Sequence, residues 1–424
     1  MTMDAITASQ AATWSIAAFA TSGVILRPWG LPEAIWAVVG AVALVLSALL
    51  PWQDALAAVS KGTDVYFFLT GMMLLAEVAR REGLFEWLAG HATEAARGSP
   101  ARLFGLVYIV GIVVTVFLSN DATAVVLTPA VYAACKAAKA KPLPYLVVCA
   151  FIANAASFVL PISNPANLVL YGNHIPALWP WLKQFALPSV LSIAATYAML
   201  RFLFRKELRG GIEAKVPVSD LSDGGRYAAY GIGATAIVLL LASALDTQLG
   251  APTFAAGAAT AAFVLIEKRE APWKLFHGVS WGVLPLVAGL FVLVQGLNNT
   301  GVVAHLTELL EWGISQSLTA TSWIAGAGLA FVTNLMNNLP AGLIAESAVT
   351  PAHPPSMVTG ALLIGVDLGP NLSVTGSLAT ILWLIVLKRE GETCSAVQFL
   401  KIGMVAMPPA LLLALGALIL TSTV

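Results

Sequence analysis

A succession of apolar stretches, separated by short polar turns, is the feature that most constrains how this chain can fold. The hydrocarbon core of a bilayer is about 30 Å thick and offers no water to backbone N–H and C=O groups, so single segments that cross it are helices. We interpret these stretches as spans: 13–26, 33–50, 63–79, 143–172, 184–204, 227–247, 252–267, 280–297, 356–387 and 402–422. The sequence therefore predicts an all-α polytopic membrane protein with about ten transmembrane spans.

Composition supports a membrane protein and argues against several other classes. Hydrophobic residues make up 58% of the chain and charged residues only 10%, far from the values of a soluble domain. The formal net charge is zero, so nothing indicates binding to nucleic acid. Cys135, Cys149 and Cys394 lie far apart, which argues against a disulfide framework, a structural zinc site or a thiol trap. We expect no cofactor and no metal site.

Charge placement predicts the topology. Two further segments, 101–136 and 321–350, each consist of two apolar arms joined by a short polar tip, which predicts two helical hairpins. With ten spans and two hairpins, the clusters of Lys and Arg fall on one side, and the positive-inside rule makes that side cytoplasmic. This model places both termini outside and the polar linker 205–226 in the cytoplasm. We expect a multi-pass protein of the bacterial inner membrane.

The linker divides the chain into halves that repeat one order of elements: span, span, hairpin, broken span, span. The first copy covers 33–204 and the second covers 252–424. Because the copies start on opposite sides of the membrane, they are predicted to be inverted repeats, an arrangement typical of secondary transporters. Segments 1–32 and 227–251 each add one helix outside the repeats.

Polar residues interrupt the apolar pattern at four places, in matching positions of the two halves. The hairpin tips read "SNDAT" from Ser119 and "TNLMNNLPAG" from Thr333. The broken spans read "NAASFVLPISNPANLVL" from Asn154 and "DLGPNLSVTGSLATILW" from Asp367. Pro and Gly stop the helical hydrogen-bond ladder, and freed backbone groups persist at membrane depth only when buried in protein or lining a wet cavity. We therefore predict that the four interruptions converge on one site.

Amide, hydroxyl and backbone groups at these interruptions are the candidate substrate ligands. They belong to Ser119, Asn120, Asn154, Ser163, Asn164, Asn337, Asn338, Thr375, Gly376 and Ser377. For any single one, a helix cap or an interhelical hydrogen bond is the alternative. No intramembrane Lys or Arg is available to hold an anion, so these groups favour a neutral, polyol-like substrate.

The acids at the interruptions, Asp121 and Asp367, are the candidate proton-coupling residues. An aspartate at the bilayer centre costs about 2.5–3.5 kcal/mol on insertion scales, so it needs a reason to be there. Glu77 ends a span beside Arg80 and Arg81, which predicts an interfacial ion pair. Glu346, in the returning arm of the second hairpin, stays open between a structural and a functional role.

Several stretches resemble one known family. "FLSNDATAVVLTP", "MNNLPAG", "GVDLGPNLSVTGSLATILWL" and "GLFEWLA" are similar to ArsB, the bacterial arsenite efflux permeases of the ion transporter superfamily, and the likeness covers most of the chain. The resemblance implies export of arsenite and antimonite, which travel as uncharged trihydroxides at neutral pH. In some members it also implies coupling to a soluble ArsA-type ATPase. Superfamily members that carry dicarboxylates have Ser-Asn-Thr at both tips, whereas here Asp121 replaces the first threonine.

Residues and resemblance together predict a secondary transporter that exports neutral metalloid in exchange for protons by alternating access, with metalloid, protons and lipid as its partners. The alternatives are a sodium/proton antiporter or an organic-anion transporter of the same superfamily, and a pure channel is not separated by sequence. An intramembrane aspartyl protease, whose two carboxylates share a proton, is a weaker alternative, because "GVDLGP" lacks the second glycine that such proteases carry before the acid. We therefore expect a transporter and not an enzyme.

Overall fold

The computed structural model describes residues 7–172, 174–214, 216 and 220–422. Throughout those residues the regular secondary structure is helical, which confirms the predicted all-α class. By length and composition, six of the described helices can cross a membrane, or up to eight if each of two bent helix pairs is one span. The number is below the ten expected partly because the stretch 33–50 forms a helix of only 14 residues. The stretches 143–172 and 356–387 are broken, as predicted.

The first half of the chain contains single helices, a hairpin, a broken helix and a long helix, in the predicted order. The elements are α1 (Ala8–Leu26), η1 (Pro28–Gly30), α2 (Glu33–Leu46), α3 (Trp52–Lys61), α4 (Thr63–Arg81), α5 (Leu84–Ala96), α6 (Pro100–Phe117), the π-helical η2 (Ala122–Leu127), α7 (Thr128–Ala137), α8 (Leu143–Ala155), η3 (Pro161–Ser163), α9 (Pro165–Tyr171) and α10 (Leu178–Leu203). Here α6 and α7 are the arms of the hairpin, and α8 and α9 are the two parts of the broken helix.

The second half repeats this order after one extra helix. The elements are α11 (Asp223–Ala244), α12 (Gly250–Lys268), α13 (Trp273–Gly278), α14 (Val283–Asn299), α15 (Val302–Gln316), α16 (Leu318–Met336), α17 (Asn338–Ala352), α18 (Ser356–Leu368), η4 (Gly369–Asn371), α19 (Leu378–Arg389) and α20 (Ala396–Ser422). In this half α16 and α17 form the hairpin, and α18 and α19 form the broken helix.

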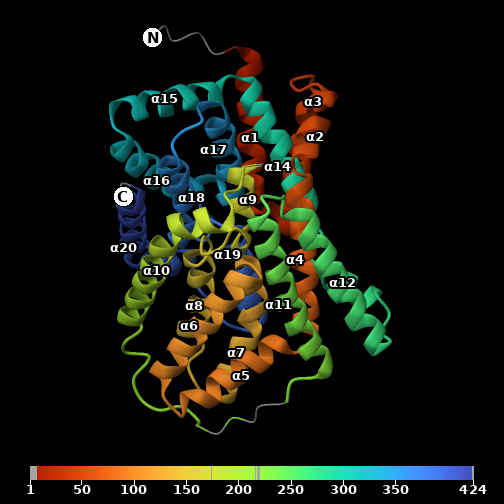
Figure 1. The fold of residues 1–424 in the computed structure, drawn as a ribbon, viewed down its shortest axis with the longest axis vertical. Helices are drawn as coiled ribbons and strands as arrows, with labels where there is room; N and C mark the ends of the chain where they lie inside the picture. The colour runs from red at the N-terminus through yellow and green to blue at the C-terminus, as the bar shows by residue number, and fades with distance from the viewer. Residues whose placement is uncertain (1–6, 173, 215, 217–219, 423–424) are drawn as a thin grey trace.

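The two halves point in opposite directions and pack reciprocally. Figure 1 shows α5 with the α6–α7 hairpin toward the lower end of the molecule, and α15 with the α16–α17 hairpin toward the upper end. The first helix of each half packs against the other half, α2 against α14 and α12 against α4, while α10 lies along α20. Inverted repeats produce such reciprocal contacts. The bounds 33–204 and 252–424 stay a prediction.

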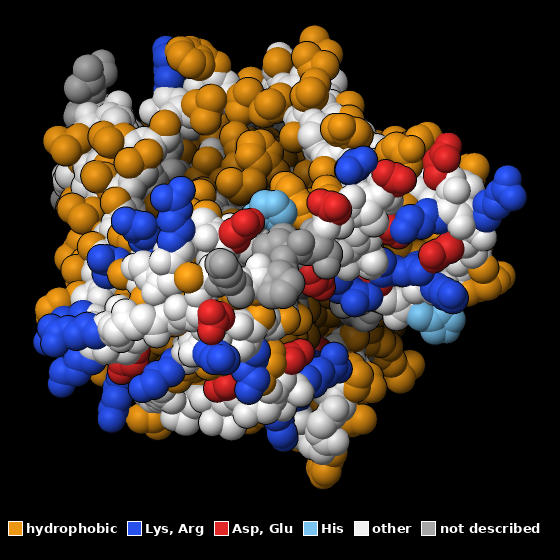
Figure 2. Space-filling view, turned by 90° about the horizontal axis from the view of Figure 1, so that it is seen from below, with side chains coloured by type: hydrophobic (Ala, Val, Ile, Leu, Met, Phe, Trp, Pro, Cys, Tyr) orange, Lys and Arg blue, Asp and Glu red, His pale blue; other side chains and the backbone are white. Residues whose placement is uncertain are grey.

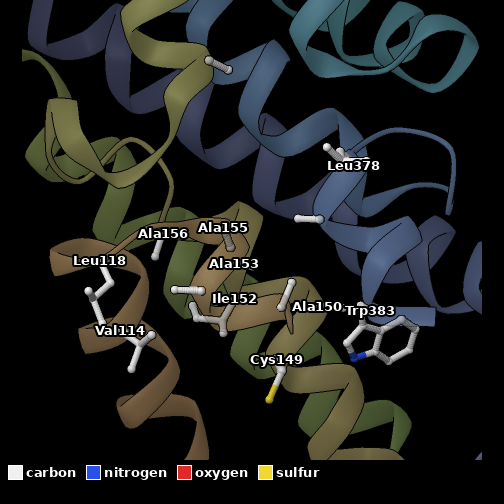
Figure 3. Packing of buried hydrophobic residues seen from close by; sticks show 14 of the residues in the cluster. Val114, Leu118, Cys149, Ala150, Ile152, Ala153, Ala155, Ala156, Leu378 and Trp383 are labelled. Atoms are coloured by element: carbon white, nitrogen blue, oxygen red, sulfur yellow. The ribbon is translucent and has the colours of Figure 1, made fainter. Parts of the chain in front are cut away.

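Helix α8 lies at the centre of the fold and is buried along almost its whole length. Figure 3 shows it between Val114 of α6 and the following Leu118 on one side and Leu378 and Trp383 of α19 on the other. The Trp383 indole Nε1 donates a hydrogen bond to the backbone carbonyl of Leu146 at 2.9 Å. A helix that is apolar all round must be enclosed by other helices, so α8 is held where its broken end can face the other half.

Two glycines bring the halves into close contact. Gly71 of α4 and Gly257 of α12 face one another, and a Cβ on Gly257 would overlap the Gly71 carbonyl oxygen. Small residues at such crossings let helix backbones approach, which is how membrane helices gain packing energy. This contact joins a helix of the first half to a helix of the second.

Charged side chains gather on one end of the molecule. Figure 2 shows many Lys and Arg side chains on the lower face, around the linker that follows α10. Ion pairs there join the helix ends, with Arg81 2.5 Å from Glu270 and Lys268 2.5 Å from Glu82. Of the predicted linker 205–226, residues 215 and 217–219 lie outside the described residues. The cytoplasmic location of this face stays a prediction.

Candidate functional site

The first hairpin turns through a short irregular tip. Helix α6 ends at Phe117, and the returning chain begins with the π-helical segment η2 before it becomes α7. The Ser119 Oγ accepts a hydrogen bond from the backbone N–H of Ala122 at 3.3 Å, so this serine caps the returning arm. Single π-helical turns are rare and are frequent at functional sites. The Asn120 Oδ1 accepts the backbone N–H of Asp121 at 2.9 Å.

Asp121 lines a cavity beside this tip. The cavity has a volume of about 80 Å³ and lies between α4, the hairpin tip and the start of α14. Ser119 and Glu77 also line it, and no Lys or Arg is among the described residues that do so. Within the described part of the chain, neither a hydrogen bond nor an ion pair reaches the Asp121 carboxylate. Asp121 is half-buried, so its charge faces the cavity without a cation to balance it.

The first broken helix is stabilised by its own amide side chains. Asn164 caps α9, because its Oδ1 accepts the backbone N–H two residues further on at 3.0 Å. The Nδ2 of Asn167 donates to the freed carbonyl of Ser157 at 2.8 Å. Ser163 Oγ donates to the backbone carbonyl of Val116 at 3.2 Å. This last bond ties the first break to the first hairpin.

The second broken helix has the same design. After Leu368 the chain passes through η4, and Ser377 caps α19 by accepting the N–H of Ala379 on its Oγ at 3.2 Å. Gly376 lies in the turn between them, where a Cβ would be 2.5 Å from the Cα of Pro370. Only glycine fits so close an approach without a shift of the backbone.

The two breaks meet through buried side chains from opposite halves. The Nδ2 of Asn164 donates to the Oδ1 of Asp367 at 2.7 Å, and the Nδ2 of Asn154 donates to the Oδ1 of Asn371 at 3.0 Å. All four residues are buried. The Oδ2 of Asp367 and the Oδ1 of Asn154 have no hydrogen-bond partner among the described residues. Buried polar atoms are normally paired, so these two atoms mark where a proton, water or substrate can bind.

The second hairpin tip is bonded to the second break. Asn337 has φ of 80°, and its Oδ1 accepts the N–H two residues on at 3.3 Å, which caps α17. The backbone N–H of Asn338 donates to the Gly376 carbonyl at 2.9 Å. Thr375 Oγ1 donates to the Asn334 carbonyl at 2.7 Å. Hydrogen bonds thus connect the end of the first hairpin's α6 arm with both breaks and the second tip.

The predicted site residues therefore lie in neighbouring elements, and several have a structural task. Ser119, Asn164, Asn337 and Ser377 each use the side-chain oxygen as a helix cap. A helix cap was the alternative role considered for any single residue, and it accounts for these four side-chain oxygens. The part that all ten candidates play in substrate binding, and that Asp121 and Asp367 play in proton coupling, stays a prediction.

Sequence reasoning missed other polar residues of the same layer. Asn371 bridges the halves, because its Nδ2 also donates to the Phe151 carbonyl at 3.0 Å. Asn334 accepts the Ser373 hydroxyl at 2.7 Å and donates to the carbonyl of Gly369 at 3.0 Å. These residues lie within or beside the quoted interruptions. Counting every amide and hydroxyl there would have found them.

Residues assigned to other roles behave as predicted. Glu77 is buried and forms an ion pair with Arg80 at 2.6 Å, which confirms the predicted pair. His305 of α15 is exposed, with its Nδ1 3.5 Å from Glu308. The three cysteines are free and buried outside the interruptions: Cys135, Cys149 and Cys394.

An all-helical membrane fold, in which two hairpins and two broken helices meet through buried polar side chains, is the architecture of a secondary transporter. The chain belongs to the CitMHS family, described as citrate transporters, whose model matches residues 16–366. It is similar to the arsenical pump membrane protein of Yersinia enterocolitica, with 29% identity over 368 residues that cover 83% of this chain and 85% of that one. It is also similar to an arsenical pump membrane protein of Escherichia coli, with 28% identity over 412 residues, 94% of this chain and 95% of that one. These relatives confirm the resemblance that the motifs indicate.

Two solved structures share the fold. The YdaH transporter of Alcanivorax borkumensis aligns with a TM-score of 0.55 at 15% identity, covering 88% of this chain and 87% of that one. MtrF of Neisseria gonorrhoeae, described within a class of antimetabolite efflux pumps, aligns with a TM-score of 0.54 at 12% identity, covering 98% and 95%. Relatives and structural neighbours are transporters, so the protein is a multi-pass membrane transporter and not an enzyme.

Proposed function

We propose that this protein exports arsenite and antimonite as neutral trihydroxides, in exchange for protons and by alternating access. The relatives that align with most of the chain are named arsenical pump membrane proteins, which supports the substrate. The buried layer offers amides and hydroxyls, which both donate to and accept from the hydroxyl groups of such a substrate, and carboxylates, which accept from them when ionised. The cysteines lie outside this layer, so the proposal needs no thiol ligand.

The observation that carries the substrate class is the chemistry of the cavity at the first hairpin tip. Ser119 and Asp121 line it, and Lys and Arg are missing from its described lining. Proteins hold carboxylate ligands with Arg or Lys, and a carboxylate substrate here would lie beside the Asp121 carboxylate. A neutral trihydroxide requires only hydrogen-bonding groups. The cavity therefore favours a neutral substrate over an organic anion such as citrate.

The proton coupling that we propose depends on the two aspartates. The Oδ1 of Asp367 accepts a hydrogen bond from Asn164, but its Oδ2 has no partner among the described residues. An aspartate held inside a membrane without a cation is costly unless it binds a proton or reaches water. Asp121 and Asp367 take up protons when the site faces outward and release them when it faces inward. Inward proton flow then drives the metalloid out.

Transport into inside-out vesicles tests the proposal, because export in the cell becomes uptake by the vesicle. A gradient that is acid inside the vesicle should make radiolabelled arsenite accumulate above its outside concentration. A protonophore should abolish the accumulation, and excess citrate should not compete. Arsenite that never accumulates under an imposed proton gradient would contradict the proposed mechanism.

The same assay separates the alternatives. Accumulation driven by a sodium gradient would favour the sodium-coupled antiporter. Equilibration without accumulation under every gradient would indicate a channel. Stimulation by an added ArsA-type ATPase with ATP would show that primary energy can replace the proton gradient, and we expect export without that subunit.

A further inference from the structure

A second cavity lies at the opposite ends of the helices that form the first. The first cavity is lined by the later part of α4 and the start of α14. The second, of about 270 Å³, is lined by the start of α4 and the later part of α14, together with α9 and α17. In Figure 1 these helix ends lie toward the upper part of the molecule, away from α5 and α7.

Residues in equivalent places of the two halves line the two cavities. One constant spacing along the chain relates several residues of the first cavity to residues of the second. The pairs are Met73 and Phe291, Glu77 and Gln295, Val125 and Leu343. The same spacing pairs Val279 with Lys61 and Val283 with Val65. The cavities are therefore counterparts under the inverted repeat, and each opens toward a different end of the molecule.

The second cavity differs from its counterpart by an added carboxylate on the returning hairpin arm. Glu346 of α17 lines it, and the equivalent position in the first half is Thr128. The Thr128 hydroxyl donates to the carbonyl of Ala124 in its own helix at 2.7 Å. The threonine hydroxyl is therefore bonded within its own helix, whereas Glu346 places an ionisable group on the wall of the second cavity.

Glu346 is half-buried and held by hydroxyl groups. Its Oε1 accepts a hydrogen bond from Thr350 Oγ1 at 3.0 Å, and its Oε2 accepts one from Ser347 at 3.4 Å. Within the described residues it forms no ion pair. Lys61 points its Nζ at Gln295, 3.5 Å away. A carboxylate in this setting can exchange a proton with water in the cavity, because no cation fixes its charge.

Other titratable groups lie on the elements around α17, and their charges contribute to the electrostatic field at Glu346. Asp64 and His174 line the same cavity as Lys61, and Asp64 already accepts the Gly250 N–H at 2.8 Å. The remaining ones on elements packed against α17 are Tyr171 on α9, Asp367 on α18, and His305, Glu308 and Glu311 on α15. The three α15 side chains are exposed, and Asp64 and Lys61 are charged residues that line the same cavity as Glu346.

Apolar residues lie between the second cavity and the helix that carries Asp367. One turn before Glu346 is Gly342, where a Cβ would be 3.6 Å from Val169 and 3.9 Å from Val366. Val169 lines the cavity, and Val366 directly precedes Asp367. The Oδ2 of Asp367, one residue further along α18, has no hydrogen-bond partner among the described residues.

We propose that Glu346 is the proton-exchange group of the second cavity, which takes protons from outer water and passes them to Asp367. The inference rests on the proposed proton-driven export. In the step, the O–H bond of the Glu346 carboxylic acid breaks as a water molecule takes its proton, and a chain of water molecules delivers a proton to the Oδ2 of Asp367, where an O–H bond forms. The negative charge moves from Asp367 to Glu346, which is then protonated again from water in the second cavity.

The test varies the pH inside inside-out vesicles, which is the outer side, while the bath pH stays fixed. Wild-type arsenite uptake should rise as the interior becomes acid. Glu346→Gln should lose this dependence on interior pH but keep arsenite exchange without a gradient, which also shows that the variant is folded. The matched control is Glu308→Gln, the same change of charge on the exposed face of α15, and it should behave as wild type.

A milder variant keeps the carboxylate and removes one of its hydrogen-bond donors. Thr350→Val takes away a hydroxyl that hydrogen-bonds to Glu346, so it should alter the dependence of arsenite uptake on interior pH, but less than Glu346→Gln does. If the wild type is driven by protons and Glu346→Gln shows the same dependence of uptake on interior pH, the role of Glu346 is wrong but the proposed proton-driven export is not. A wild type without any dependence on interior pH overturns the proton coupling and the role of Glu346 with it.

Discussion

A single side chain at an interruption can cap a helix and also hydrogen-bond to a buried residue of the other half. Asn164 shows this most directly, since its Oδ1 caps α9 while its Nδ2 donates to Asp367. An asparagine can do both because its amide offers an acceptor and two donors. Capping and site formation are therefore not competing explanations for this residue. The cap fixes the amide so that the remaining donor points at the carboxylate.

Replacing each aspartate by asparagine keeps the shape of the side chain but removes its ability to carry a charge. Asp121→Asn and Asp367→Asn retain an acceptor oxygen but cannot titrate. We expect at least one variant to lose accumulation of arsenite under a proton gradient while it keeps gradient-free exchange, with Asp121 favoured because its carboxylate faces the cavity. Vesicle uptake at matched membrane levels measures both activities. Normal accumulation in both variants would leave the aspartates with a structural role only.

For the cysteines, in contrast to the aspartates, we predict that substitution has little effect on transport. Cys149 Sγ donates weakly to the Tyr145 carbonyl at 3.6 Å, a bond that a serine hydroxyl can also make. Cys135 and Cys394 are buried away from the polar layer as well. Replacing each by serine should leave arsenite resistance of expressing cells largely intact. Loss of transport in a single cysteine variant that inserts normally would instead identify a thiol ligand.

At the scale of helices, irregular ends and close crossings determine where the polar groups lie. The broken helices expose backbone groups that amides from the same break satisfy, as Asn167 does for Ser157. Close crossings between the halves then hold these breaks in register. The contact of Gly71 with Gly257 is one such crossing, and its geometry leaves no room for a side chain.

A valine at this crossing should destabilise the protein. Gly257→Val would drive side-chain carbons into the Gly71 backbone, and overpacking of this kind costs about 1–3 kcal/mol. The matched control is Gly233→Val on α11, where a Cβ meets nothing within 4 Å. Thermal unfolding in detergent should show a lower midpoint for Gly257→Val and little change for Gly233→Val. Equal midpoints would contradict the close crossing of α4 and α12.

At the scale of the whole molecule, the two oppositely directed halves create a cavity toward each end. Reciprocal packing of α2 on α14 and of α12 on α4 means that neither half can bury its helices alone. The polar interruptions of the two halves meet where side chains of the two broken helices hydrogen-bond to one another. An inverted pair with its polar groups at mid-depth is what alternating access to one site requires.

The orientation of this arrangement in the membrane gives a further prediction. The positive-inside rule, applied to the basic clusters, predicts that the linker is cytoplasmic and that the termini are outside. Reporter fusions after Gly210 and at the C-terminus should therefore give opposite sides, with Gly210 cytoplasmic. A fusion after Arg97, in the turn before the first hairpin, should agree with Gly210. Reports of the same side from Gly210 and the C-terminus would refute the predicted topology.

Much of this protein follows from the order of its residues alone. The apolar stretches require helices, because lipid cannot satisfy backbone groups, and Pro and Gly between them predict where two helices break. The pair Glu77 and Arg80 follows from spacing on one helix. All of these are local effects, set by residues within a few turns of one another, and therefore readable without the fold.

Contacts across the halves were decided by tertiary packing. Nothing near Asn154 in the sequence indicates that its donor meets Asn371, or that Asn164 rather than Asn154 reaches Asp367. Matching positions predicted that Asn154 and Asp367 are equivalent, but equivalent residues of an inverted pair need not touch, because the crossing angle of the helices selects the partners. The second cavity with Glu346 depends in the same way on how α4, α9, α14 and α17 come together. Such contacts join residues that are distant in the chain, and only the packed molecule determines their distance.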